Sequence, residues 1–243
     1  MSGAPLPLLG VFHELSIAVR DVRASVDFYE RLGFTQATTT DTFTHPYGVL
    51  TDGRLVIGLH QRAGPTPVLT FVRAGVAGTL PAYADAGIEL TVCRTGDEVF
   101  NEVGFADPFG HAVAVLEART YSPTDRRQTQ TGLCGDFAEV SLPAGDFAAA
   151  QTFWEPLGFV AAEEEVPYPR LSLTSNHLDI TFHRPQLHLQ PMLVFRGPDM
   201  AARIARLREL GFELGAALAT SHDRAAFLES PDGTTLLLLA AED

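Results

Sequence analysis

The amino-acid sequence predicts an α+β protein built from four βαβββ units, and two observations carry this prediction. The second half of the chain repeats the first: "FYERLGF" at residues 28–34 corresponds to "FWEPLGF" at 153–159, and "DPFG" at 107–110 corresponds to "SPDG" at 230–233. Each half then divides again into two stretches with the same order of predicted elements. That order is a strand, a helix and further strands separated by turns.

The first unit shows the pattern most clearly. Residues 12–19, "FHELSIAV", alternate in polarity with the period of two that is typical of a strand. Asp21 can cap the helix that follows, whose apolar residues share one face, and Gly33 can end it. The turn "TDGR" at residues 51–54 then introduces a strand at 55–61, "LVIGLHQ".

The other three units repeat this order. The second opens with the strand "PVLTFV" at residues 67–72 and has a weaker helix signal. The third opens with "AEVSLPA" at 138–144, and Asp146 can cap its helix. The fourth opens with "PMLVFR" at 191–196, and the spacing of its apolar residues predicts a helix over 199–210.

Length and charge limit the class of protein. A chain of 243 residues, 46% of them hydrophobic, can bury a large core and most naturally forms two domains. We expect a first domain at residues 1–118, a linker at 119–135 and a second domain at 136–243. Thirty acidic and seventeen basic side chains give a net charge of -13, which disfavours nucleic acid and anionic membranes as partners.

The cysteines and the amino terminus indicate the compartment. Cys93 and Cys134 are too few for a disulfide framework and lack C-x-x-C spacing, so we expect free thiols in a reducing environment. The amino terminus has no basic region before its apolar residues, and no eighteen apolar residues run together. These features predict a cytoplasmic protein with no membrane partner.

Alternation along the strands assigns side chains to the two faces of each predicted sheet. In the first strand Leu15 and Ile17 should pack under the helix with His13, which leaves Glu14 on the opposite face. The polar residues expected on this second face in the two copies are Glu14, Ser16, Tyr47 and His60, and Glu139, Ser141, Tyr168, Asp179, Thr181 and His183. A glutamate, a serine, a tyrosine and a histidine therefore recur as a set.

The order of elements, with "SVDFYERLGF" at 25–34 and "ADPFGHAVAVLEA" at 106–118, resembles the vicinal-oxygen-chelate superfamily. This superfamily contains glyoxalases, bleomycin-resistance proteins, fosfomycin-resistance enzymes and extradiol dioxygenases. The resemblance implies two cup-shaped mixed sheets with helices outside, and a ligand inside a cup. It also implies a monomer, because two copies already supply what single-domain relatives obtain by dimerising; a homodimer is the alternative.

The second wall of each predicted cup is apolar. Alternation along the opening strands of the second and fourth units predicts that the following residues face into the cups: Pro67, Leu69, Phe71, Pro191, Leu193 and Phe195. The closing strands add Ala112, Ala114, Thr235 and Leu237. We predict that Phe71 and Phe195 bind the ligand together with the glutamate, serine, tyrosine and histidine of each copy.

The resemblance also implies where a metal ion would bind. The positions that match the ligands of metal-dependent relatives are Glu14, Gly58, Pro67 and Ala114 in one copy and Glu139, Thr181, Pro191 and Leu237 in the other. Only the glutamate is a usual ligand, so no cofactor is expected. The alternative is a displaced divalent-metal site within a copy, formed by Glu14 and His60 in the first copy or by Glu139, Asp179 and His183 in the second, although catalytic zinc usually takes three protein ligands.

The leading functional hypothesis is a protein that binds, and sequesters, a small organic molecule. A cationic or drug-like compound would suit the predicted cups, because buried carboxylates pair best with a positive partner. One alternative is a glyoxalase-like lyase, isomerase or dioxygenase that uses displaced metal ligands, or Glu14 or Glu139 as general base. The other is structural: both glutamates would be buried carboxylates satisfied by a tyrosine or histidine opposite.

Overall fold

The strands form two eight-stranded mixed sheets, one from each copy. The structure is a computed structural model that describes residues 8–37, 43–118, 132–162, 168–217 and 225–241. The strand order is β2-β3-β4-β1-β5-β8-β7-β6 in the first sheet and β10-β11-β12-β9-β13-β16-β15-β14 in the second. The predicted α+β class and the four βαβββ units are confirmed. Residues 119–131 of the predicted linker lie outside the described residues, and the domain boundaries stay predictions.

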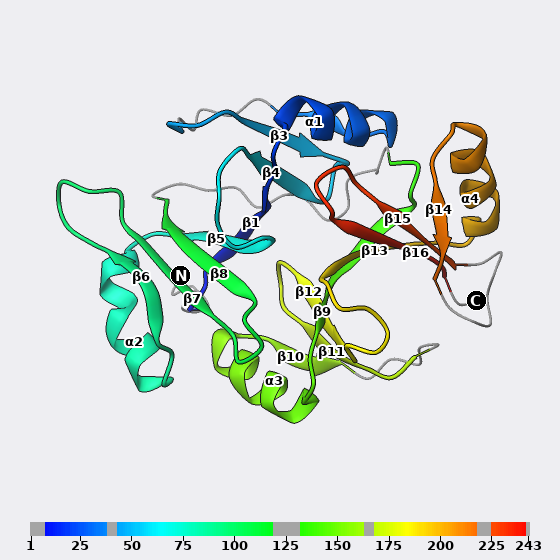
Figure 1. Cartoon of the computed structure of the whole chain (residues 1–243). Helices are drawn as coiled ribbons and strands as arrows, with labels where there is room; N and C mark the ends of the chain where they lie inside the picture. Colours follow the sequence, from blue (N-terminus) through cyan, green and yellow to red (C-terminus); the bar gives the residue numbers. More distant parts are fainter. Residues whose placement is uncertain (1–7, 38–42, 119–131, 163–167, 218–224, 242–243) are drawn as a thin grey trace, which may run out of the picture.

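The elements of the first copy follow the predicted order (Figure 1). They are β1 (Val11–Ala18), α1 (Val22–Arg31), β2 (Thr35–Gln36), β3 (Tyr47–Thr51), β4 (Val56–His60), β5 (Val68–Arg73), η1 (Val76–Thr79), α2 (Leu80–Asp85), β6 (Leu90–Arg94), β7 (Glu102–Ala106) and β8 (Ala112–Glu117).

The second copy has the same order. Its elements are β9 (Asp136–Pro143), α3 (Phe147–Trp154), η2 (Glu155–Leu157), β10 (Val160–Ala162), β11 (Arg170–Thr174), β12 (Asp179–His183), β13 (Met192–Gly197), α4 (Met200–Glu209), β14 (Leu214–Ala216), β15 (Ala225–Glu229) and β16 (Thr235–Ala240). None of the helices among the described residues is long and apolar enough to cross a membrane.

Helix caps fix where the first helix of each copy begins. The Asp21 carboxylate accepts hydrogen bonds from the backbone N–H groups of Arg23 and Ala24, at 2.9 and 3.2 Å. Asp146 caps α3 in the same way, so both predicted caps are confirmed. Gly33 follows α1 with a φ of 92°, a left-handed conformation that favours glycine and ends the helix.

Each sheet pairs the two units of one copy through their opening strands. β1 runs antiparallel to β5, and β9 runs antiparallel to β13. Parallel pairing then joins β1 to β4 and β5 to β8, and the same pairs recur in the second sheet. Both units that shape one concave face therefore belong to the same copy.

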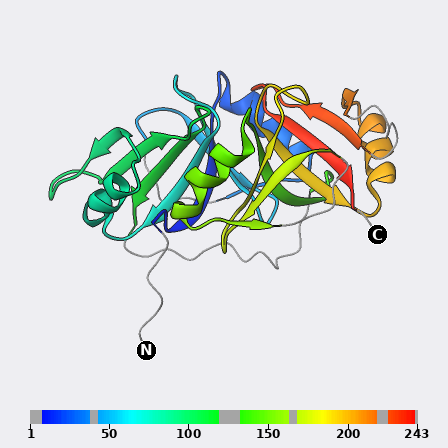
Figure 2. The same ribbon diagram turned by 90° about the horizontal axis from the view of Figure 1, so that it is seen from below.

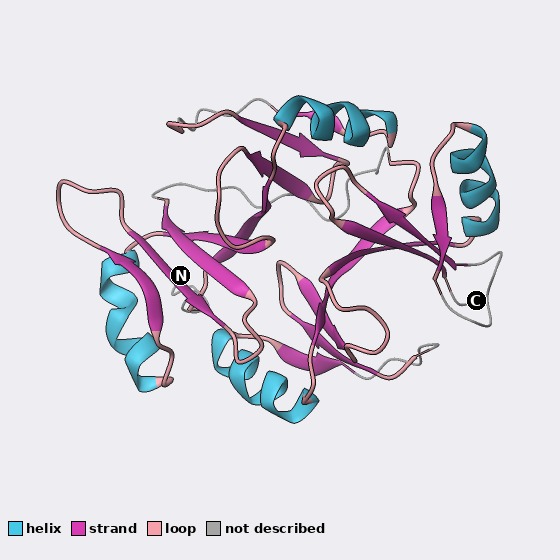
Figure 3. Cartoon of the chain, in the orientation of Figure 1, coloured by secondary structure: helices cyan, strands magenta, loops and turns pink. Residues whose placement is uncertain are grey.

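One hydrophobic core extends through both copies and packs the helices against the convex faces of the sheets. Figures 1 and 3 show the helices on the outside of the strands. Phe34, after α1, makes an edge contact with Phe195 of β13, with ring centroids 6.4 Å apart. The Trp154 indole donates a hydrogen bond across the copies to Asp107, at 3.3 Å. Figure 2 shows the two sheets beside each other from below. The opposite, concave faces point away from the shared core, and these faces carry the predicted polar residues.

Candidate functional site

A buried hydrogen-bonded cluster, the first-copy cluster, consists of Glu14, Ser16, His60 and Thr70. The Ser16 hydroxyl donates to Glu14 Oε1 at 2.6 Å and lies 2.8 Å from the Thr70 hydroxyl. His60 Nε2 lies 3.2 Å from the same Glu14 oxygen. All four side chains are buried. The structure thus brings together three of the residues predicted for the first copy, Glu14, Ser16 and His60, and places the fourth predicted polar residue, Tyr47, against His60.

Aromatic rings cover this cluster. Tyr47 stacks on His60, and Phe43 meets His60 edge to face, with ring centroids 5.9 and 4.8 Å apart. His45 Nε2 lies 3.0 Å from His60 Nδ1. Burial pushes the pKa of Glu14 up, but hydrogen bonds from His60 and Ser16 outweigh burial and hold this pKa below its usual value. Glu14 is therefore a carboxylate at neutral pH, and His60 donates to it from Nε2.

The Glu14 carboxylate lies directly against Gly58. A Cβ atom built on Gly58 would lie 2.4 Å from both carboxylate oxygens, which is closer than atoms can approach. The carboxylate can occupy this place only because residue 58 has no side chain. Gly58 pairs with Ser16 across β4 and β1, so the bare backbone and the serine hold the carboxylate from two sides.

The second copy has diverged at this position. Thr181 pairs with Ser141 as Gly58 pairs with Ser16, so a threonine stands where the first copy has glycine. Glu139 forms ion pairs with Arg170 and, at 3.5 Å, with Arg196. Glu139 and Arg170 are both buried. The second copy thus has a threonine in place of the glycine that contacts Glu14, and its glutamate, Glu139, pairs with arginine instead of histidine.

The histidine of the second copy has separate partners. Ser141 Oγ lies 2.8 Å from His183 Nδ1, and His183 Nε2 lies 3.0 Å from the carbonyl oxygen of His188. The carbonyl can only accept, so Nε2 carries the proton and Nδ1 accepts from the serine. Burial lowers the pKa of His183 to about 4, which keeps the ring neutral at pH 7.

This low pKa predicts that His183 makes the protein less stable in acid. Below pH 6.5 the unfolded chain binds a proton that His183 in the folded protein does not bind, so stability falls as the pH drops from about 6.5 to about 4. Between pH 7 and 4.5 we expect His183 to account for a loss of about 2–3 kcal/mol. Urea denaturation of the wild type and of His183→Gln at both pH values measures it. An equal loss in both proteins would contradict this assignment.

Glu14 and His60 are in contact, but among the described residues no third ligand joins them, and the candidate ligands of the second copy are not brought together. Glu14 and His60 lie in the first copy, whereas Glu139 is paired with arginine and His183 with Ser141. Asp179 accepts a hydrogen bond from Thr174 at 2.6 Å. Each potential ligand of the second copy is thus directed to a different protein group.

The prediction that Phe71 and Phe195 face the cups is wrong. Leu69 pairs with Leu15, while Thr70 pairs with Glu14, so Thr70 lies on the concave face and its neighbours on the convex face. The same register in the second copy gives the concave face to Met192, Val194 and Arg196 and places Pro191, Leu193 and Phe195 off it. Counting from the sequence misjudged the start of both opening strands by one residue, and such a slip exchanges the faces.

The match of Tyr47 with Tyr168 is out of register by two residues. Tyr47 pairs with His60, and the residue that pairs with the equivalent His183 is Arg170. Tyr168 lies two residues before Arg170, buried with a hydroxyl that has no hydrogen-bond partner among the described residues. Sequence reasoning missed Arg170, although the offset of 123 residues between the two histidines, applied to Tyr47, identifies it.

A pocket of about 540 Å³, here called the junction pocket, lies between the two copies. The first copy contributes Phe12, His13, Arg54 and Val56, and the second contributes residues of β9, β11, β12 and β13 and the turn between β11 and β12. His13, which was expected to face the helix layer, is the extra residue of a bulge in β1 and lines this pocket.

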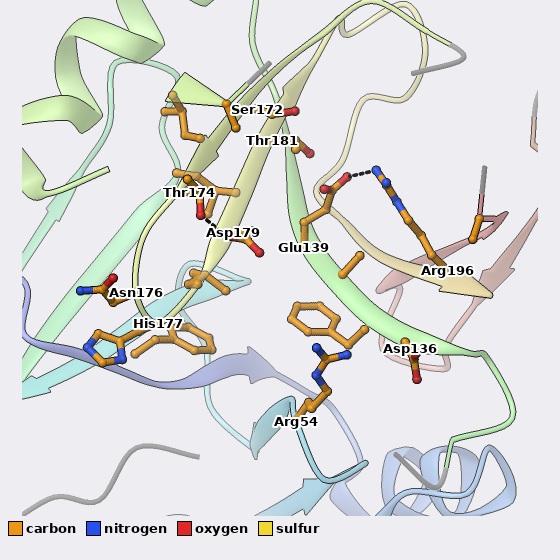
Figure 4. Close-up of a pocket in the computed structure, with 18 of the residues that line it drawn as sticks. Arg54, Asp136, Glu139, Ser172, Thr174, Asn176, His177, Asp179, Thr181 and Arg196 are labelled. Carbon is orange, nitrogen blue, oxygen red and sulfur yellow. Dashed lines mark hydrogen bonds and ion pairs between the residues drawn. The ribbon is translucent and has the colours of Figure 1, made fainter. Parts of the chain in front are cut away.

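Equivalent segments of both copies meet in the junction pocket. Phe12 corresponds to Phe137, two residues before each glutamate, and Arg54 corresponds to His177 in the turn before each histidine strand. Figure 4 shows Glu139 joined to Arg196 on one side of the pocket and Arg54 entering from the first copy. Of the residues predicted to bind ligand, only Glu139 lines this pocket.

Comparison with known proteins agrees with this fold. Residues 11–115 match the model of the Glyoxalase/Bleomycin resistance protein/Dioxygenase superfamily. The second sheet repeats the first strand for strand. The first copy is therefore similar to this superfamily, in agreement with the resemblance seen in the sequence. No curated protein sequence matches the chain.

Solved structures align along nearly the whole chain. A catechol 2,3-dioxygenase has a TM-score of 0.65 and 14% identity, over 98% of this chain and 89% of that one. The 2,3-dioxygenase LapB from Pseudomonas sp. KL28 has 0.64 and 15%, over 99% and 94%. The Mn(II)-bound glyoxalase from Novosphingobium aromaticivorans has 0.61 and 13%, over 97% and 83%. Identities this low show the fold and leave the reaction open.

The described residues do not fit a divalent metal such as the Mn(II) bound by the Novosphingobium glyoxalase. With the register corrected, the positions beside each glutamate are held by Gly58, Thr70 and Ala114 in the first sheet and Thr181, Val194 and Leu237 in the second. In the described part of the chain, no group of three or more His, Cys, Asp or Glu residues could hold a metal ion. The absence of a cofactor stays a prediction.

Proposed function

We propose that this chain is a small-molecule-binding member of the superfamily that its first copy resembles and that the junction pocket is its ligand site. The observation that carries the proposal is a pocket of about 540 Å³ with aromatic and charged side chains contributed by both copies. Its volume falls within the range of known small-molecule sites, and a site between two packed units is a common location for them.

The alternative of an enzyme has less support. A general base works best with a pKa near the working pH, whereas the pKa of Glu14 is held below its usual value and its carboxylate is buried against Gly58. Glu139 is already paired with Arg170 and Arg196. Each glutamate therefore has a structural partner that competes with a substrate proton, and the structural hypothesis explains both of them.

The same contacts weaken the prediction of a cationic ligand. That prediction assumed that Glu14 and Glu139 need a positive partner, but His60 and Arg170 supply hydrogen bonds or charge from within the protein. We propose a cytoplasmic setting on the cysteine usage alone, since Cys93 and Cys134 are free thiols.

Blocking the pocket tests the proposal. Asn176 is an exposed residue at the edge of the pocket, so Asn176→Trp should fill the entrance without disturbing the core. We expect a panel of small acids, amides and amines to contain compounds that raise the melting temperature of the wild type by a few degrees, since a ligand at about 100 times its Kd stabilises a protein by about 2.7 kcal/mol. Asn176→Trp should abolish this rise.

The matched control is Gln186→Trp, which adds the same bulk at an exposed turn residue that does not line the pocket. This variant should respond to ligands as the wild type does. Two results would count against the proposal: no compound that shifts the melting temperature, or hits that bind Asn176→Trp as well as they bind the wild type.

A further inference from the structure

The geometry points to Arg54 as the anchor for a singly charged organic anion, such as a carboxylate, in the junction pocket. This inference rests on the proposed function and names the ligand's charge. Arg54 lies in the turn between β3 and β4, half-buried, and its side chain lines the pocket (Figure 4). Its guanidinium forms no hydrogen bond or ion pair with any residue that the structure describes, although its backbone N–H is bonded.

The nearest acidic residue in the chain does not serve as its partner. Asp52, two residues before Arg54, is buried and accepts hydrogen bonds at 2.8 Å from the backbone N–H groups of Arg54 and Leu55. These two bonds direct the Asp52 carboxylate to the turn itself. The Arg54 guanidinium is left facing the pocket with its donors available, and its planar fork matches an oxyanion.

Thr181 adds a second polar group. Its hydroxyl is buried, lines the same pocket and has no hydrogen-bond partner among the described residues. A buried hydroxyl without a partner is unfavourable, and a water or another polar group of a bound ligand would satisfy it. Arg54 and Thr181 come from different copies, so the site exists only where the copies meet.

The acidic side chains of the pocket limit the charge of the ligand. Asp136, Glu139 and Asp179 also line it, and like charges repel a dianion more strongly than a monoanion. Phe12 and Phe137 offer ring surface beside the charged groups. A carboxylate attached to an apolar or planar body therefore fits the pocket better than a phosphate monoester.

Calorimetric titration with matched probes tests the inference on the full chain. The probes are benzoate and phenylacetate, their uncharged amides benzamide and phenylacetamide, and the doubly charged phenyl phosphate. The wild type should bind the carboxylates at least tenfold more tightly than the amides or the phosphate. Arg54→Gln should weaken carboxylate binding about 10-fold to 100-fold and leave amide binding unchanged, as expected for loss of a charge-assisted hydrogen bond.

The control is Arg208→Gln, which removes the same charge from an exposed site on α4 and should bind as the wild type does. Carboxylate binding that Arg54→Gln leaves intact overturns the inference. Amides that bind as tightly as the acids, and are lost in Asn176→Trp, also overturn it but leave the proposed function standing. If none of the five probes binds with a Kd below about 10 mM, the anion site is rejected, and the wider panel decides on the proposed function.

Discussion

Gly58→Ala should lower the free energy of unfolding by about 2–4 kcal/mol, because it removes the space that the buried Glu14 carboxylate occupies. An added Cβ would lie 2.4 Å from both carboxylate oxygens. If the carboxylate moves away, His60 and Ser16 lose the oxygen to which both are bonded. The loss can be measured by urea denaturation at pH 7.

Two comparisons separate this effect from a general effect of alanine. In a Glu14→Ala background the same Gly58→Ala change should cost less than half as much, because the clashing carboxylate is gone. Gly78→Ala should change stability by less than about 1 kcal/mol, since a Cβ at Gly78 would meet nothing within 4 Å. Equal losses at Gly58 in both backgrounds would contradict the close packing of Glu14 on the backbone.

The fold could be predicted from the sequence because its signals are local and repeated. Each of these signals depends on residues close together in the chain: the alternation around Glu14, the helix caps Asp21 and Asp146, and the glycine after the first helix. Duplication shows the same signals twice, so one copy supports the interpretation of the other. These signals predicted the strands, the helices and the side on which Glu14 and Glu139 lie.

The candidate site could be predicted only in part, because it depends on register between distant strands. The face of β5 is set by its pairing with β1, where the bulge at His13 brings Thr70 beside Glu14. The sequence "PVLTFV" does not indicate this pairing. Both sets of alternate residues in it are largely apolar, so either set could form a buried face. The apolar wall was therefore assigned to the wrong residues, among them Phe71 and Phe195.

Charge pairing between elements was equally invisible in the sequence. Arg170 and Glu139 are 31 residues apart and meet only because β11, β12 and β9 are neighbours. The sequence analysis assumed that both copies keep the same contacts, and for this reason it missed Arg170. In the second copy Thr181 replaces Gly58 and Arg170 replaces Tyr47. Two equivalent glutamates thus end with different partners.

Arg170→Met should destabilise the protein by about 3–5 kcal/mol, which is typical when one partner of a buried ion pair is removed. The side chains of Arg170 and Glu139 are 1% and 6% exposed, so water cannot replace the lost charge. Methionine keeps much of the volume and the apolar stem of the arginine, so the loss reports the charge more than a cavity. Arg196 stays 3.5 Å from Glu139 and compensates part of its charge, so we expect a loss near the lower end of this range.

A second substitution decides whether the unpaired carboxylate causes the loss. Glu139→Gln in the Arg170→Met background removes the uncompensated charge, so the double variant should recover at least half of the lost stability. Arg206→Met, which removes the partner of Glu209 in an exposed pair on α4, should change stability by less than about 0.5 kcal/mol. If the double variant is as unstable as Arg170→Met, the charge of Glu139 is not what Arg170 balances. If it recovers, the glutamate of the second copy is held by an arginine that the first copy does not have.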